Sequence, residues 1–299
     1  ISYLYEMASF KKPKKGSYRR FLFIDGNEAV NSLSALEGGS IEEILSRAAD
    51  EGSGGGELGA GFGFSGANVK GKIGKTKARK YEEEILRKRT EHSAITLLLE
   101  KLRDKDEIGS IESYTPDVHE QIEEDELYEF KAEIRIHPFH QFVSIAQGWS
   151  EMGENLEEDP GDVEELVEIA RQAEKLFHGK NKDQKALVVF AEMEGTAPEY
   201  KLVAPVKRSG LRVPLDEFSG RATFVAQVER KLEGGDEVLA ARIVRNAPML
   251  PMERQMMLEM LPALQSAPGD LDIGFKIDEA DVLLRKPALI LKPLCIYKG

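Results

Sequence analysis

Residues 186–244 contain four apolar segments: ALVVFAEME (186–194), YKLVAPVKR (200–208), ATFVAQVERKL (222–232) and DEVLAARIV (236–244). Each segment is short and rich in β-branched residues, which is typical of strands. Gly234 and Gly235 join the last two segments, and this dipeptide favours a tight hairpin. We therefore predict an antiparallel meander in this part of the chain.

The region before this meander is predicted to hold one strand and two helices. LYEFKAEIRI at 127–136 alternates apolar and charged residues, as a half-buried strand does. One helix is predicted to start at Pro138, and a second is opened by Asp159 and Pro160 and ended by Gly179.

The region after the meander is predicted to hold a methionine-rich helix and a final strand. The spacing of the methionines at 252–264 favours a core-facing side over a surface adapted to partners. The apolar strand at 288–297 contains Pro293 and follows Pro287, and both prolines should limit its pairing. The order of elements predicts an α+β fold, with helices plus an antiparallel sheet, rather than a doubly wound sheet.

The N-terminal part is predicted to begin with a strand at Phe21–Ile24 and a helix capped by Asp25. A short helix at 41–49 and a long charged helix at 77–105 flank a glycine-rich insert, residues 52–76. Dense glycine weakens helices and strands, so the insert is predicted to be a mobile loop, a ligand contact or a conformational switch.

We predict three regions along the chain. They are a basic arm (1–19), a strand–helix region with the glycine-rich insert and the long helix (20–110), and an α+β domain with the helix pair and the meander (111–299).

Two phosphate-binding patterns occur in the glycine-rich insert, and both are incomplete. Gly61, Gly63 and Gly66 match GxGxxG, but the preceding residues lack the apolar strand that a dinucleotide fold requires. Gly74-Lys75-Thr76 resembles the end of a P-loop, but Val69 occupies the position of its first glycine. A nucleotide-binding enzyme is therefore the weakest of the functional hypotheses.

The insert also has the pattern of a β-hairpin over residues 57–75. Apolar residues alternate with glycine in the first arm, and Lys70 and Lys72 alternate with apolar residues in the second. An oligomer of such hairpins would place apolar side chains toward lipid and lysines toward a polar lumen. A surface loop or a small soluble hairpin explains the same pattern more simply.

The net charge of −12 is unevenly distributed along the 299 residues. Residues 11–20 hold six basic residues and no acid, whereas residues 104–168 hold 21 acids and three bases. Opposite charges of this kind are typical of solvated surfaces, and they also favour self-association of a basic patch with an acidic one. An anionic membrane is a further possible partner, while the overall acidity and the lack of interleaved aromatic residues argue against nucleic acid.

Catalytic and metal-binding patterns are poor in this sequence. His137 and His140 form HPFH across a strand-to-helix junction, which favours packing over metal ligation. His92 on the long helix is likewise expected to be packed. The single cysteine, Cys295, lies in an apolar run and is expected to be buried. We therefore predict no catalytic residues, no metal and no cofactor, and the protein is more readily interpreted as a binding module than as an enzyme.

Two stretches carry a family resemblance. FLFIDGNEAVNSLSALEGG near the start, followed by a glycine-rich insert, and PALILKPLCIY near the end resemble an uncharacterised prokaryotic family classified as a domain of unknown function. The resemblance covers most of residues 20–299 and brings no catalytic residues. It implies a bacterial or archaeal cytoplasmic protein from a mobile or defence-related gene neighbourhood.

The leading functional hypothesis is a non-catalytic assembly or partner-binding module, and a membrane-acting effector is the alternative. Exposed aromatic residues flanked by glycine fit a partner's pocket, and lysines add charge. The predicted partner-binding residues are all in the insert: Phe62, Phe64, Lys70, Lys72 and Lys75. A cytoplasmic location is expected, because no run of eighteen apolar residues occurs and the N-terminal charges follow a short apolar part.

Overall fold

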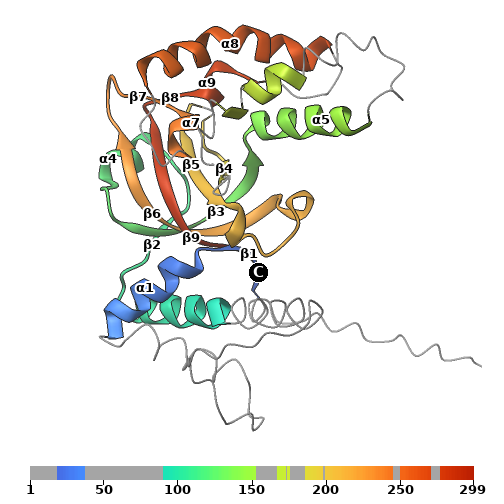
Figure 1. Cartoon of the computed structure of the whole chain (residues 1–299). Coiled ribbons are helices and arrows are strands. Elements are labelled where there is room, and N and C mark those ends of the chain that lie inside the picture. The colour runs from blue at the N-terminus through green and yellow to red at the C-terminus, as the bar shows by residue number, and fades with distance from the viewer. Residues whose placement is uncertain are drawn as a thin grey trace, which may run out of the picture.

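The computed structural model describes residues 19–37, 90–152, 167–172, 174–175, 186–197, 199–244, 250–270 and 277–299. The strands in these residues are β1 (Arg20–Ile24), β2 (Gly109–Ile111), β3 (Leu127–Ile136), β4 (Ala186–Glu192), β5 (Lys201–Lys207), β6 (Gly220–Leu232), β7 (Glu237–Leu239), β8 (Leu283–Arg285) and β9 (Ala288–Lys298). The helices are α1 (Gly26–Glu37), α4 (Pro116–Gln121), α5 (Pro138–Met152), α7 (Ala240–Ile243), α8 (Pro251–Asp270), α9 (Glu279–Val282), the 3-10 turns η3 (Arg208–Gly210) and η4 (Leu215–Glu217), and helical segments over residues 90–104, 167–172 and 174–175. The predicted α+β class is confirmed (Figure 1).

Five strands close into a barrel in the order β9, β5, β4, β3, β6 and back to β9. Four of these neighbouring pairs are antiparallel, and β5 pairs with β9 in parallel. Two further strands extend the sheet, because β1 lies antiparallel to β9 and β2 lies parallel to β3. The sheet is therefore mixed, although antiparallel pairing dominates as predicted.

The predicted hairpin across Gly234 and Gly235 is wrong. Gly235 does have a positive φ of 93°, as a glycine turn requires, but β7 then pairs with β8 instead of returning to β6. One edge of β6 is occupied by β9 as far as Leu232, and the loop before β3 bonds to Val228 on the other edge. No edge of β6 is left for a hairpin partner.

The C-terminal strand β9 pairs with three other strands, β1, β5 and β6. Pro293 falls at a shift in the register opposite Ala226, so the predicted effect of this proline is a local irregularity. The strand remains central because its pairing continues on both sides of that point.

The barrel interior is filled by side chains that alternate along the strands. On β3, Phe130, Ala132 and Ile134 are buried, while Lys131 and Glu133 point to the outside and are exposed. The rings of Phe130 and Phe224 stack inside the barrel with centroids 5.4 Å apart and an angle of 5° between their planes. The barrel is thus a packed core rather than a channel.

Two helical layers cover opposite parts of the barrel wall (Figure 1). In one layer, α5, α7 and α8 bury apolar residues together with Val188, Val203 and Ile290 of the strands. In the other, α1 and the 90–104 helix pack with Ile24 and Leu294. Asp25 caps α1 as predicted, because its Oδ1 accepts a hydrogen bond from the Glu28 backbone at 3.3 Å.

The chain after β5 lies directly against β1. Leu211 forms a bridge to Phe23, and the Arg212 backbone N–H donates to the Leu22 carbonyl at 2.8 Å. A Cβ at Gly210 would lie 2.4 Å from Phe23 Cε2 and 2.6 Å from the Ile24 carbonyl oxygen. The close approach therefore requires glycine at this position.

We expect Gly210→Ala to lower the free energy of unfolding by about 1–3 kcal/mol, because the backbone oxygen cannot move aside without disturbing β1. Gly234→Ala is the matched control, since nothing lies within 4 Å of a Cβ there. Urea titrations of both variants measure the difference. Equal stability of the two variants would show that β1 can shift freely.

Candidate functional site

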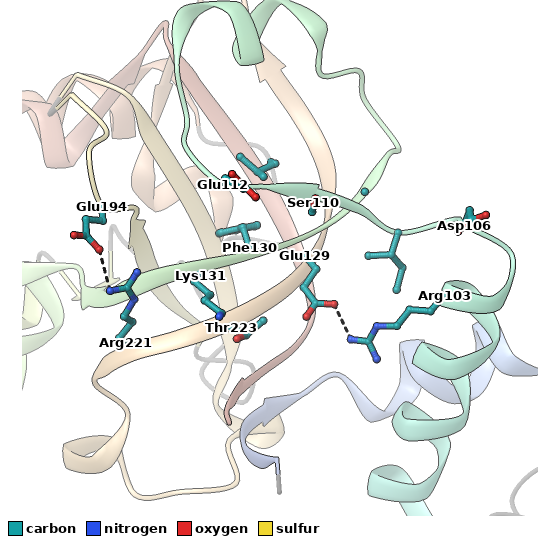
Figure 2. Close-up of a pocket in the computed structure, with 13 residues that line it drawn as sticks. Arg103, Asp106, Ser110, Glu112, Glu129, Phe130, Lys131, Glu194, Arg221 and Thr223 are labelled. Carbon is teal, nitrogen blue, oxygen red and sulfur yellow. Dashed lines mark hydrogen bonds and ion pairs between the residues drawn. The ribbon is translucent and has the colours of Figure 1, made fainter. Parts of the chain in front are cut away.

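A groove crosses the outer wall of the barrel where β2, β3 and β6 meet (Figure 2). Its volume is about 620 Å³, within the range of ligand pockets in proteins. The side chains that bear charge in its lining are Arg103, Asp106, Glu112, Glu129, Lys131, Glu194 and Arg221. The first two lie on the 90–104 helix and in the loop after it. Glu112 follows β2 and Glu194 follows β4. The other three lie at outward-facing positions of β3 and β6.

The groove lies where two strands pair with different parts of the same edge of β3. β2 pairs with β3 at Tyr128–Phe130, and β4 pairs with it only from Glu133 onward. Lys131 and Ala132 lie between these two ladders and pair with neither strand. The wall of the barrel is therefore open at this point, and β2 is the edge strand beside the opening.

One end of the groove is formed by a hydrogen-bonded charge network. Arg103 Nη2 donates to Glu129 Oε2 at 2.6 Å, and the Tyr297 hydroxyl donates to Glu129 Oε1 at 2.8 Å. Burial favours a higher pKa for Glu129, but the hydrogen bonds from Arg103 and Tyr297 outweigh it and hold the pKa below its ordinary value. Burial, and then the bond to Glu129, raise the pKa of Tyr297 to about 12. The network keeps its charges at physiological pH and forms a fixed wall.

The other end of the groove is more open to solvent. Arg221 Nη1 lies 2.9 Å from Glu194 Oε2, and both side chains are more than half exposed, so the pair is easily exchanged for another partner. Lys131 lies between the two ends and is exposed. Its ammonium group makes no hydrogen bond or ion pair with any residue that the structure describes. Its ammonium group is thus available to a ligand.

Every partner-binding residue predicted from the sequence, from Phe62 to Lys75, lies outside the described residues, so that prediction is untested. The groove residues were not predicted. The alternation of LYEFKAEIRI does place Lys131 on the outside of its strand. Only the barrel closure brings Arg221 and Arg103 beside it.

The histidines have the packing roles that the sequence predicts. The Phe139 N–H donates to His137 Nδ1 at 3.1 Å, and the Val188 N–H donates to His140 Nε2 at 2.9 Å. His92 contacts the ring of Phe21 edge-on at 5.5 Å. Within the described residues, no group of three or more histidine, cysteine or carboxylate side chains is arranged to hold a metal ion.

Cys295 is fully buried on β9, as predicted, and burial raises the pKa of its thiol. Among the described helices, none combines the length and the apolar character needed to cross a membrane.

Comparison with known proteins identifies a family. No curated protein and no solved structure matches the chain. The predicted resemblance to a domain-of-unknown-function family is confirmed, because the model of such a family matches residues 18–297. The chain therefore belongs to the family described as domain of unknown function DUF6414.

Proposed function

We propose that the protein is a non-catalytic binding module whose groove holds an extended segment of a partner protein. The observation that supports this is the opening in the barrel wall at Lys131 and Ala132, beside the edge strand β2. Strand edges present backbone donors and acceptors that an extended peptide can pair with, and side-chain pockets then give specificity. The groove supplies both features in one place.

The charges of the groove indicate which side chains the segment carries. Lys131 is exposed and lacks a carboxylate partner in the described part of the chain, so an acidic side chain of the partner would pair with it. The exposed Arg221–Glu194 pair can open at small cost and offer a second positive charge. We infer that the segment is acidic near its centre.

The proposal includes a cytoplasmic location in a prokaryote, in a defence-related setting, and this part rests on the family resemblance. The membrane-acting effector and the nucleotide-binding enzyme both depend on the glycine-rich insert. That insert lies outside the described residues, and both alternatives remain predictions.

Reversal of one charge tests the binding groove. We expect Lys131→Glu to weaken binding of the partner by about tenfold or more, because the change puts a carboxylate opposite a carboxylate. Tagged wild-type protein and the variant are used to capture partners from cells, and the captured protein is then titrated against both by calorimetry. Lys175→Glu is the matched control, because Lys175 is also exposed but lies on a separate helical segment outside the groove.

The melting temperatures of both variants should stay close to that of the wild type, because both lysines are exposed. A partner that binds Lys131→Glu as tightly as the wild type contradicts the proposal. Sedimentation of the purified chain adds a separate outcome. If wild-type protein self-associates and Lys131→Glu is monomeric, the segment in the groove comes from a second copy of the chain rather than from another protein.

A further inference from the structure

A second hollow lies at β1, between the 90–104 helix and the chain that follows η3. Its volume is about 660 Å³. Its polar lining consists of Arg19, Arg20, His92, Arg212 and Glu217. None of these residues lines the groove proposed above to bind a partner, so the two sites are independent.

Arg212 is the unusual member of this cleft. Its side chain is 4% exposed, and its Nη2 forms an ion pair with Glu91. The backbone on both sides is fixed by the bridge from Leu211 to Phe23 and the hydrogen bond from Arg212 to Leu22. These backbone contacts therefore fix the position of Arg212 at the cleft.

Two of the three guanidinium nitrogens of Arg212 have no hydrogen-bond partner among the residues that the structure describes. Nε and Nη1 are buried and unpaired, while only Nη2 contacts a carboxylate. Leaving a buried charged donor unpaired is costly, so native structures rarely keep such groups without a reason. An acceptor that enters the cleft would remove this cost.

The surroundings of Arg212 favour an anion as that acceptor. Arg19 lies over the ring of Tyr297 at 5.3 Å from the centroid, and its charge has no carboxylate in direct contact among the described residues. Arg20 is paired with Glu217, and both side chains are about half exposed. Three arginines and one carboxylate line the cleft, and Glu91 adds a second carboxylate beside Arg212, so one positive charge is left in excess.

We propose that this cleft binds the phosphate group of a soluble small molecule. The planar fork of an arginine matches two phosphate oxygens, and this geometry is the reason that arginine dominates phosphate recognition. The volume leaves room for the rest of a molecule of metabolite size. Since Nε and Nη1 have almost no contact with solvent, side chains of the cleft must shift to admit the phosphate, and the exposed Arg20–Glu217 pair in its lining can open at small cost.

Calorimetric titration of the full chain with inorganic phosphate and with pyrophosphate tests the proposal. We expect saturable binding of at least one anion and a melting temperature that rises with its concentration. Arg212→Lys should weaken binding about tenfold, because an ammonium group cannot replace the bidentate fork. Arg254→Ser is the control, since Arg254 is an exposed, ion-paired arginine outside the cleft, and it should bind like the wild type.

Arg20→Ser is a second test of binding, which remains informative if Arg212→Lys fails to fold. Arg20 is exposed and its loss should leave the fold intact, yet it should weaken binding severalfold by lowering the positive potential. Absence of saturable binding in wild-type protein, or unchanged affinity in both Arg20→Ser and Arg212→Lys, would overturn the proposal. Vesicles of phosphatidylcholine with and without phosphatidic acid distinguish the phosphate of a soluble molecule from that of a lipid headgroup. Binding only to phosphatidic acid vesicles, with neither soluble anion bound, would replace the small molecule by a lipid headgroup.

Discussion

Phe224→Ala is expected to lower the free energy of unfolding by about 3–5 kcal/mol, the usual cost of emptying a buried aromatic position. Phe224 has no exposed surface and stacks on Phe130 inside the barrel. Its strand is hydrogen-bonded to β3 on one side and to β9 on the other, so the wall cannot collapse into the space left behind. The cavity should therefore persist, and the free energy of unfolding should fall by the full amount.

Urea unfolding followed by circular dichroism measures this loss. Phe224→Leu provides the comparison, because it keeps most of the volume and should cost less than half as much. A loss below about 1 kcal/mol for Phe224→Ala would mean that the interior is loosely packed, contrary to the stacked arrangement in the structure.

Acid should destabilise the protein through His137, by about 3 kcal/mol between pH 6.5 and pH 4. His137 is completely buried at the junction of β3 and α5, and this burial lowers its pKa from 6.5 to about 4. Its Nδ1 accepts from Phe139, so its Nε2 donates to the Asp281 carbonyl at 2.9 Å. The neutral ring thus makes one hydrogen bond with each of these two neighbours. A second proton would sit on Nδ1 and point at the Phe139 N–H.

The direction of the effect follows from the two pKa values. Above pH 6.5 the ring is neutral in both the folded and the unfolded state, and the stability is complete. As the pH falls through 6.5, the unfolded chain takes up a proton that the folded protein does not accept until about pH 4, so stability is lost across this window.

Chemical unfolding at a series of pH values tests this expectation. His137→Gln is the comparison, because it has no proton to gain in this range. The variant should be less stable at pH 7, and its stability should fall less steeply than that of the wild type between pH 6.5 and 4. Parallel curves for the two proteins would assign the acid sensitivity to other groups.

Features set by neighbouring residues could be predicted from the sequence. The alternation in LYEFKAEIRI correctly identifies β3, and HPFH correctly indicates packing at the start of α5. Asp25 correctly marks the start of α1. In each case the pattern and the interaction lie within a few residues, so local chemistry decides the outcome.

Features set by distant partners could not be predicted in the same way. Gly234 and Gly235 favour a turn, but β9 already pairs with the edge of β6, so the strand after the turn pairs with β8 instead. In RSGLRVPLDE, Arg212 looks like a surface charge, but it is buried and paired with Glu91, which lies 121 positions away in the chain. The open wall at Lys131 likewise depends on where β2 and β4 leave the sheet, which no short segment encodes.

The central position of β9 has a consequence for how the protein is made. β9 is translated after β1, β5 and β6, all of which need it as a neighbour. Until residues 288–298 have left the ribosome, the nascent barrel has open edges that can pair with other chains. The pairing of Phe21 with Tyr297, which adds β1 to the barrel, also spans nearly the whole chain, which slows folding. We therefore expect premature termination before β9 to yield aggregation-prone products rather than a smaller stable domain.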